Sequence, residues 1–265
     1  MTGSMSKPFD LSGRTALVTG ANTGIGQAIA VALAEAGADV AVAGRTPPVE
    51  TQEMVERAGR RFVAISADFT SIEPVPRIME EAVAGLGHVD ILVNNAGIIR
   101  RADSIDFSEA DWDDVMNVNI KSVFFLCQAF ARHVFARRAA GGNSGEDAKG
   151  KIINIASMLS FQGGIRVPSY TASKSGIAGV TKLLACEWAG KGINVNAIAP
   201  GYVETNNTTA LRADETRNAE ILARIPAGRW SVPSDMAGPA VFLASDASDY
   251  VHGITLPVDG GWLAR

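Results

Sequence analysis

The chain has 265 residues, of which 47% are hydrophobic and 20% are charged, and its formal net charge is −4. These values are typical of a globular protein with one sizeable core, and they exclude the strongly basic surface that is usual in nucleic-acid binding. No apolar run reaches the ~18–20 residues of a membrane span, and residues 1–7 contain no signal-peptide hydrophobic stretch. We therefore expect a cytoplasmic protein.

Short apolar runs alternate with longer helical stretches along the chain. The runs that predict buried strands are Arg14–Thr19, Asp39–Ala43, Phe62–Ser66, Ile91–Asn94, Ile152–Ser157, Asn194–Ala199 and Ile254–Val258. The stretches with helical spacing are Gly24–Ala36, Trp112–Arg137, Tyr170–Ala189 and Asp235–Ala244. Strands that are apolar on both faces and separated by helices predict an α/β fold. We expect a Rossmann-type doubly wound parallel sheet of about seven strands, with helices on both faces.

The predicted domain organisation is simple. A second methionine, Met5, follows a Gly-Ser pair, so residues 1–8 are interpreted as a disordered segment or a remnant of cloning. No linker divides residues 9–265, which we expect to form a single domain. The segment Ala139–Lys149 is rich in glycine, serine and charge, and it predicts a solvated, mobile loop rather than a domain boundary.

Cysteines and histidines give no sign of a disulfide framework or a metal site. Cys127 and Cys186 lie far apart in helix-like segments, and both are interpreted as small core residues. The three histidines, His88, His133 and His252, show no metal-ligand spacing. We therefore expect no catalytic metal.

A glycine-rich segment, Thr19–Gly26, joins the first predicted strand to the first predicted helix. Glycines at 20, 24 and 26 would let the backbone turn tightly and approach a pyrophosphate closely. The following helix offers free N–H groups and the positive end of its dipole. A glycine-rich turn without a ligand is the alternative, but the position between a strand and an amphipathic helix favours a dinucleotide. The residues expected to bind the dinucleotide are Gly20, Asn22, Thr23, Gly24, Ile25 and Gly26.

The end of the second strand indicates which dinucleotide is bound. NAD-binding folds often place an acid there to bind the ribose hydroxyls, whereas this chain has Gly44 and Arg45. Arg45 can pair with a 2′-phosphate, so the sequence leans toward NADP over NAD; a solvated surface arginine is the alternative. Asp68, beside Phe69 after the third strand, is expected either to accept a hydrogen bond from adenine or to cap a turn.

Tyr170 and Lys174 stand four residues apart at the start of a long apolar helix. Residues at i and i+4 share a helix face, about 6 Å apart along the axis. A phenol with a pKa of about 10 needs a pKa lower by about three units to act as a base near neutrality. A nearby ammonium and an oxidised nicotinamide can supply that change. Ser157, at the end of the fifth strand, would hydrogen-bond the substrate oxygen.

The combined motifs resemble the short-chain dehydrogenase/reductase family. The chain contains the glycine-rich loop Thr19–Gly26, the turn Asn94-Asn95-Ala96-Gly97, and Ser157 followed by the Tyr-x-x-x-Lys motif of Tyr170–Lys174. Asn119 and Pro200-Gly201 also match in order, and the resemblance covers about residues 9–265.

The resemblance implies a role for each matched residue in hydride transfer with NAD or NADP. Tyr170 would be the general acid/base, Lys174 would bind the nicotinamide ribose, Ser157 would orient the substrate oxygen, and Asn119 would hold a proton-relaying water. Asn94 would brace the sheet. The residues that would line the cofactor elsewhere are Asn95, Ala96, Gly97, Pro200, Gly201, Val203 and Thr205.

Several segments are similar to a branch of the family that acts on acidic sugars, among them Ile153–Lys174, Ala199–Thr208 and Arg224–Trp230. A sugar-acid substrate needs a cation and many polar partners. The candidates are Arg100, Gln162, Arg166 and Asn207, together with Ser157. For both arginines a surface or inter-subunit salt bridge is the alternative, and Trp230 and Trp262 are interpreted as packing residues.

Other functions remain as alternatives. A gluconate dehydrogenase, a reductase of acyl-carrier-protein substrates and a cofactor-binding regulatory protein without turnover all fit part of the pattern. The helices over Trp112–Phe135 and Tyr170–Trp188 carry apolar residues on more than one face, including Val123–Leu126, which indicates burial against another subunit. The family resemblance implies a homotetramer. We expect neither a nucleic-acid nor a membrane partner.

Overall fold

The computed structural model describes residues 8–140 and 148–265. The tail at residues 1–7 and most of the predicted loop at 139–149 lie outside the described residues. The described part contains a seven-stranded parallel sheet in the order β3-β2-β1-β4-β5-β6-β7. Its strands are β1 Thr15–Thr19, β2 Asp39–Gly44, β3 Phe62–Ser66, β4 Ile91–Asn94, β5 Gly150–Ile155, β6 Ile193–Pro200 and β7 Thr255–Val258.

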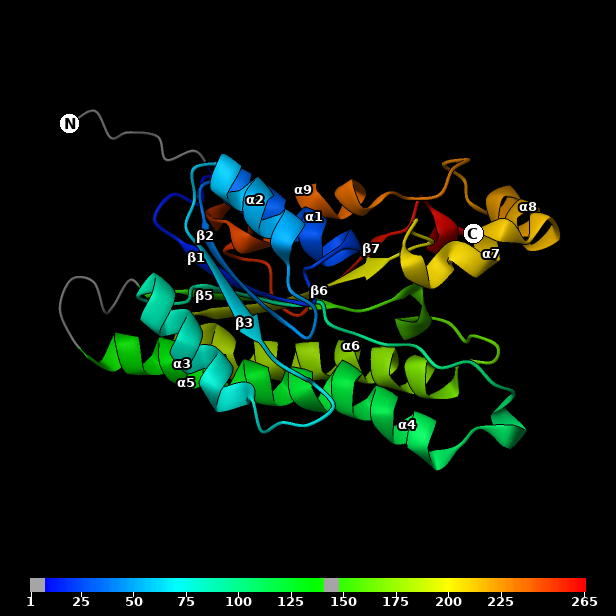
Figure 1. Cartoon of the computed structure of the whole chain (residues 1–265), viewed down its shortest axis with the longest axis horizontal. Coiled ribbons are helices and arrows are strands. Elements are labelled where there is room, and N and C mark those ends of the chain that lie inside the picture. The colour runs from blue at the N-terminus through cyan, green and yellow to red at the C-terminus, as the bar shows by residue number, and fades with distance from the viewer. Residues whose placement is uncertain (1–7, 141–147) are drawn as a thin grey trace.

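Helices cover both faces of the sheet (Figure 1). Helices α1, α2 and α9 cover one face, α3 to α6 cover the other, and the short α7 and α8 lie beside the C-terminus. The helices are α1 Gly24–Glu35, α2 Val49–Arg57, α3 Val75–Leu86, α4 Glu109–Met116, α5 Ser122–Ala139, α6 Pro168–Trp188, α7 Thr209–Ala213, α8 Glu215–Arg224 and α9 Ala237–Ala244. The predicted doubly wound α/β fold is therefore confirmed.

The buried strands explain why the sequence folds this way. Every residue of β1, β4, β5 and β6 is buried, because helices cover both sides of the central strands. One core lies between the sheet and α3, α5 and α6, and a second lies between the sheet and α1 and α9. No helix in the described part of the chain is long and apolar enough to cross a membrane.

Three details differ from the sequence expectations. The predicted helix Trp112–Arg137 is divided into α4 and α5 by one turn of π-helix, Asn117–Lys121. The fifth strand ends at Ile155, so Ser157 instead caps a short 3₁₀ turn. Cys127 is buried as expected, but the prediction for Cys186 is wrong because its position on α6 is exposed.

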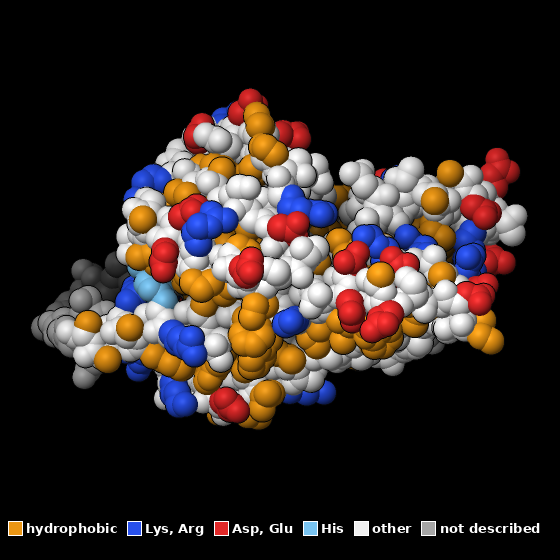
Figure 2. Space-filling model, turned by 60° about the horizontal axis from the view of Figure 1, so that its bottom comes forward, with side chains coloured by type: hydrophobic (Ala, Val, Ile, Leu, Met, Phe, Trp, Pro, Cys, Tyr) orange, Lys and Arg blue, Asp and Glu red, His pale blue; other side chains and the backbone are white. Residues whose placement is uncertain are grey.

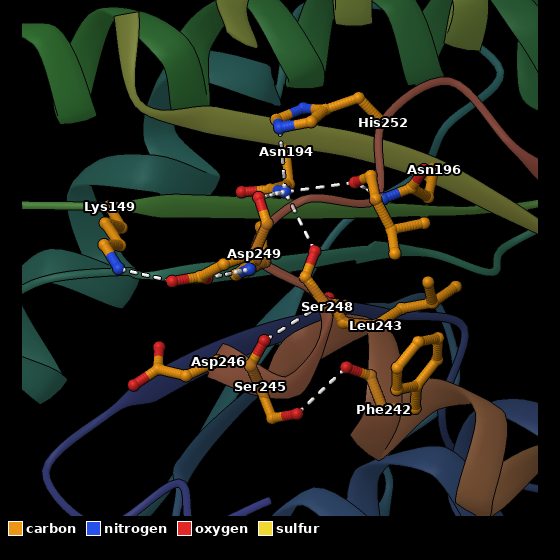
Figure 3. Close-up of polar contacts among 12 residues, drawn as sticks. Lys149, Asn194, Asn196, Phe242, Leu243, Ser245, Asp246, Ser248, Asp249 and His252 are labelled. Atoms are coloured by element: carbon orange, nitrogen blue, oxygen red, sulfur yellow. Dashed lines mark hydrogen bonds and ion pairs between the residues drawn. The ribbon is translucent and has the colours of Figure 1, made fainter. Parts of the chain in front are cut away.

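Polar contacts hold together the amino ends of β5, β6 and the segment before β7 (Figure 3). Asp249 forms ion pairs with Lys149 at 2.6 Å and with the fully buried Lys151 at 2.7 Å. Burial lowers the pKa of Lys151, and the carboxylate opposes that change. The Asn194 amide donates to the backbone oxygens of Ser248, Asp249 and Val251. The side chains at the amino ends of these strands are thus occupied by internal contacts, whereas cavities open at the carboxyl ends of the strands.

Candidate active site

Two cavities open at the carboxyl ends of the strands, where ligands of open α/β sheets usually bind. The first, of about 630 Å³, is lined by the segments after β1, β2, β3 and β4 together with residues 204–207. The second, of about 520 Å³, is lined mainly by residues 157–167, α8 and Trp262. Tyr170 and Asn207 line both cavities, so they lie where the two meet.

The glycine-rich loop lines the first cavity, as predicted for a phosphate cradle. Gly20 and Gly24 adopt positive φ values of 63° and 61°, which side chains disfavour. A Cβ at Gly20 would lie 2.8 Å from Ala96 Cα, and one at Gly26 would lie 2.5 Å from the Gly20 carbonyl oxygen. These two glycines therefore bring the loop against the Asn95–Ala96 turn, a reason for glycine that the sequence argument did not give.

The N-terminus of α1 faces the same cavity without a competing side chain. Thr23 is the N-cap residue, yet its side chain makes no capping hydrogen bond, which leaves the first N–H groups of the helix available. Such groups, together with the helix dipole, favour an anion. The candidate residues Asn22, Thr23, Gly24, Ile25 and Gly26 all line this cavity. Its residues therefore fit the pyrophosphate of a dinucleotide.

The Asn94–Gly97 turn is fixed to the glycine-rich loop by its own side chains. The Asn95 amide donates to the carbonyls of Thr19 and Gly20, at 3.0 and 2.9 Å. Asn94 donates to Asn154 Oδ1 at 2.8 Å, which confirms its expected role of bracing β4 against β5. Asn95, Ala96 and Gly97 line the first cavity.

Arg45, which directly follows β2, lines the first cavity. It is exposed, and within the described residues no carboxylate forms an ion pair with it. Asp68 lines the same cavity and accepts a hydrogen bond from the Thr70 N–H at 2.9 Å, so it does cap a turn. That hydrogen bond, and then the charge of Arg45, lower the pKa of Asp68. Phe69 also lines the cavity.

The predicted residues after β6 are divided between the cavities and the core. Thr205 lines the first cavity and Gly201 lines the second. Val203 is buried in the core beside α9, and Pro200 lies in neither cavity wall.

Tyr170, Lys174 and Ser157 come together where the cavities meet. The Lys174 ammonium lies 5.6 Å from the centre of the Tyr170 ring and donates to the Ile155 carbonyl at 2.6 Å. The Ser157 hydroxyl accepts from the Leu159 N–H at 3.2 Å. Ser160 donates to the Lys174 carbonyl at 2.6 Å and so fixes this turn to α6.

The electrostatics of Tyr170 differ from the expectation. Burial raises the pKa of Tyr170, while a hydrogen bond from Ser157 and the charge of Arg101 oppose the rise. Burial also lowers the pKa of Lys174 to about 8. The sequence argument expected Lys174 to depress the pKa of the tyrosine, and the structure adds Arg101 as a cation whose charge acts in that direction.

Asn119 lies in the π-helical turn and is almost fully buried. Its side chain accepts from the Ile98 N–H and donates to the Ile98 carbonyl, both at 2.9 Å, and it also donates to Ser173. Gly97 lies between it and Lys174, since a Cβ there would be 3.3 Å from Asn119 Oδ1 and 3.8 Å from Lys174 Nζ. Asn119 therefore holds the segment after β4 against α6.

The predicted substrate arginines occupy other places. Arg100 lies at the edge of the first cavity and pairs with Asp111 and Asp114, both at 3.2 Å. Arg166 lines neither cavity and pairs with Asp103 at 3.0 Å. Both therefore follow the salt-bridge alternative. Gln162 and Asn207 do line the second cavity.

The sequence analysis missed three arginines in the wall of the second cavity: Arg101, Arg217 and Arg224. Arg101 is the sequence neighbour of a residue that was singled out, and Arg224 begins a segment quoted only for its resemblance. Both arginines therefore stood in segments already under consideration. The direction of their side chains, however, depends on how the segment after β4 and helix α8 fold over the cavity. Trp262, interpreted as a packing residue, is buried and also lines this cavity.

Comparison with known proteins shows which family has this arrangement of residues. A family model described as enoyl-(acyl carrier protein) reductase, of the short-chain dehydrogenase type, matches residues 20–263. The chain belongs to the short-chain dehydrogenase/reductase family. It is an NAD(P)-dependent oxidoreductase, in agreement with the prediction from its motifs.

Individual relatives are similar over nearly their whole length. The 2-dehydro-3-deoxy-D-gluconate 5-dehydrogenase of Escherichia coli is 63% identical over 97% of this chain and 98% of its own. A crystal structure with bound NADP, provisionally assigned as a 2-deoxy-D-gluconate 3-dehydrogenase of Agrobacterium tumefaciens, is 61% identical with a TM-score of 0.90, covering 98% of this chain and 100% of that one. A gluconate 5-dehydrogenase of Burkholderia cenocepacia, in complex with NADP and tartrate, is 39% identical with a TM-score of 0.89, covering 97% and 98%.

Proposed function

We propose that this protein oxidises the C5 hydroxyl of 2-dehydro-3-deoxy-D-gluconate with NAD(P), and reduces the corresponding ketone in the reverse direction. The observation that carries the proposal is the place of Tyr170, which lines both the nucleotide cavity and the second cavity. A group that exchanges a proton with the substrate while a hydride passes to the cofactor must stand at that junction. The 63% identity to a dehydrogenase of this sugar acid supports the choice of substrate.

The residues at the junction can share the chemistry as follows. The bound nicotinamide supplies the hydride acceptor. Ser157, which hydrogen-bonds Tyr170 in this structure, would turn its hydroxyl to the substrate oxygen, and Tyr170 takes the hydroxyl proton of the substrate during oxidation. The buried ammonium of Lys174 would hold the nicotinamide ribose. A water held beside Asn119 relays the proton from Lys174 to solvent. Residues 9–265 act in this proposal as one domain that carries both sites.

The second cavity suits an anionic substrate rich in hydroxyl groups. Arg101 and Arg224 line it and form no ion pair with any carboxylate of the described residues, whereas Arg217 pairs with Glu220 at 2.9 Å. An unpaired guanidinium in a cavity is a natural partner for a carboxylate. The Burkholderia relative holds tartrate, which is also a hydroxy acid.

We also propose that NADP is the preferred cofactor and that the active form is a homotetramer. Arg45 supports the first part, because it lines the first cavity at the end of β2, where the adenosine ribose would lie, and forms no ion pair within the described residues. The helical layer α3–α6 supports the second part, because hydrophobic side chains gather on this face (Figure 2). Leu183 on α6 is 50% exposed, and Phe124 and Phe125 on α5 are only partly buried.

A spectrophotometric screen tests the proposed reaction. The purified protein is supplied with 2-dehydro-3-deoxy-D-gluconate, D-gluconate or a β-hydroxyacyl thioester, each with NAD and with NADP, and formation of the reduced nicotinamide is measured. We expect the highest kcat/KM with the first acid. A higher value with gluconate would assign the activity of the Burkholderia relative instead, and a higher value with the thioester would assign an acyl reductase.

Tyr170→Phe is the matched control for this screen. Removing one hydroxyl from a proton-transfer position should lower kcat by about 10²–10⁴-fold, and the dissociation constant of the cofactor should change by less than about threefold. Near-normal turnover in this variant would reject the proton-transfer role of Tyr170. Absence of turnover in both proteins with every substrate would favour the non-enzymatic alternative.

A further inference from the structure

The last residues of the chain turn back under helix α8. Gly260 and Gly261 adopt φ values of 66° and 90°, and a Cβ on Gly261 would lie 3.0 Å from the Pro226 ring. Ala227 donates its N–H to the Gly260 carbonyl at 3.0 Å, and the Asp259 carboxylate caps the turn. The turn is therefore pressed against the segment that follows α8, and this fixes the direction of the next side chain.

That side chain is Trp262, which occupies the space between α8 and the turn that carries Ser157. It is only 5% exposed and packs with Met158 and Ile221. The Tyr202 ring meets it edge-on, with 4.8 Å between ring centres. Because Trp262 also lines the second cavity, it connects the packing of the C-terminal turn to the wall of that cavity.

Trp262 sets the orientation of the Gln162 amide. The indole Nε1 donates to Gln162 Oε1 at 3.3 Å. An indole N–H can only donate, so the amide oxygen must face the indole and the amide NH₂ must face elsewhere. Within the described residues this NH₂ has no hydrogen-bond acceptor, and Gln162 lines the second cavity. Two donors are thus left for a ligand oxygen.

Trp262 also holds the guanidinium of Arg224. The Arg224 Cζ lies 4.0 Å from the centre of the indole ring, a cation–π contact. A guanidinium held by its face keeps its in-plane N–H donors free. No carboxylate of the described residues pairs with Arg224, in contrast to Arg217 in the same wall.

We propose that Arg224 and Gln162 form the recognition pair for the substrate carboxylate, and that Trp262 is the residue that positions both. This assignment rests on the proposed function, because it requires an acidic substrate. In 2-dehydro-3-deoxy-D-gluconate the C1 carboxylate is four carbon–carbon bonds from the reacting C5. Arg101, whose charge acts on Tyr170, therefore stands at the reacting end, and the carboxylate needs a different cation. Arg224, which lies on α8, supplies it.

Four substitutions and one matched control separate this role from general packing. Arg224→Gln removes the cation and Arg224→Lys keeps the charge, while Trp262→Phe keeps an aromatic face but loses the bond to Gln162. Trp262→Leu removes both contacts. The control is Trp230→Phe, in the same aromatic cluster, whose indole donates at 2.7 Å to Asn218 rather than to a cavity residue. Each protein is measured for kcat, KM for the acid, the dissociation constant of NADPH and the melting temperature.

We expect Arg224→Gln to raise KM by about 10- to 100-fold, the range of a lost charge-assisted hydrogen bond, with kcat within about threefold of the parent. Arg224→Lys should recover part of that loss. Trp262→Phe should raise KM by about two- to tenfold and Trp262→Leu by more, with NADPH affinity unchanged. The KM of Trp230→Phe should stay near that of the parent.

Two results would overturn the assignment: an unchanged KM in Arg224→Gln, or equal KM values in Trp262→Leu and Trp230→Phe. The parent protein is measured first, which keeps the two proposals apart. Failure of the parent to oxidise the acid rejects the proposed function, whereas normal activity of the parent and of all the variants rejects only the recognition pair.

Discussion

Arg100 and Arg101 are adjacent in the sequence but act in opposite surroundings. Arg100 is paired with two carboxylates of α4, so its charge is already neutralised. Arg101 donates to the Asn207 carbonyl at 3.2 Å and lies close enough to Tyr170 to affect its pKa. A cation that must attract a substrate carboxylate cannot also be held by the protein's own acids. The distribution of ion pairs therefore distinguishes the arginines better than their sequence positions do.

The same reasoning applies to Arg45 at the other cavity. We expect Arg45→Ala to raise the dissociation constant of NADPH by about 10- to 100-fold, because a guanidinium–phosphate contact is a charge-assisted hydrogen bond. NADH has no 2′-phosphate, so its dissociation constant should change by less than about threefold. Fluorescence titration of the reduced cofactors measures both values. Equal losses for NADPH and NADH would remove the phosphate contact from the proposal.

Residues whose placement depends on local geometry could be predicted from the sequence. Tyr170 and Lys174 face the same way because they lie four residues apart on a helix. Asn95 and Gly97 closely follow the carboxyl end of β4, where the cavities open. Arg224 and Trp262 were missed as substrate contacts because the C-terminal turn brings them together across a gap of 37 intervening residues. No periodicity or motif reports such a contact.

At the scale of elements, the β1–α1 loop and the β4 turn form one unit. Within the glycine-rich loop, the most closely packed glycine is Gly26, whose added Cβ would meet the Asn95 amide and lie 2.5 Å from the Gly20 carbonyl oxygen. Gly26→Ala must therefore displace the Asn95 side chain and the backbone at Gly20 and Ala21. We expect it to lower the free energy of unfolding by about 1–3 kcal/mol, the usual cost of overpacking, and to weaken cofactor binding.

Gly238→Ala is the control for this prediction. Gly238 lies on α9, where an added Cβ would meet nothing within 4 Å. Alanine is favoured over glycine in helices by up to about 1 kcal/mol, so this variant should be as stable as the parent or more stable. Denaturant unfolding with and without NADPH measures both effects. If the two variants were equally stable, the packing of the loop against Asn95 would not explain the glycine.

Other elements could be predicted only in part. All seven strands were expected from their apolar runs, because buried parallel strands need side chains that suit both faces. The π-helical turn Asn117–Lys121 was not, since the tertiary bonds of Asn119 to Ile98 and Ser173 accompany it. The short helices α7 and α8 were also missed, because their lengths of 5 and 10 residues leave little periodicity to detect.

For the whole molecule, the amino and carboxyl ends of the strands differ in how their polar side chains are paired. At the amino ends lie Lys151, Asp249 and Asn194, whose polar groups are paired with one another or with the backbone. At the carboxyl ends of the strands, the first cavity meets the second, in which Arg101 and Arg224 form no ion pair within the described residues. Tyr170 at the junction lets one residue act on ligands in both cavities.

The helical layer α3–α6 leads to the remaining prediction, on assembly. Hydrophobic side chains gather on this face (Figure 2), and a contiguous exposed apolar patch commonly marks an interaction site. Leu183 on α6 is 50% exposed. We expect light scattering coupled to size exclusion to give four times the mass of one chain. Leu183→Glu places a charge on this face and should shift the protein toward dimers or monomers, because a buried, unpaired carboxylate is costly. Val49→Glu is the control, since Val49 is 62% exposed on α2 in the opposite layer. A tetramer that persists in Leu183→Glu but dissociates in Val49→Glu would place the subunit contact on the other face of the sheet.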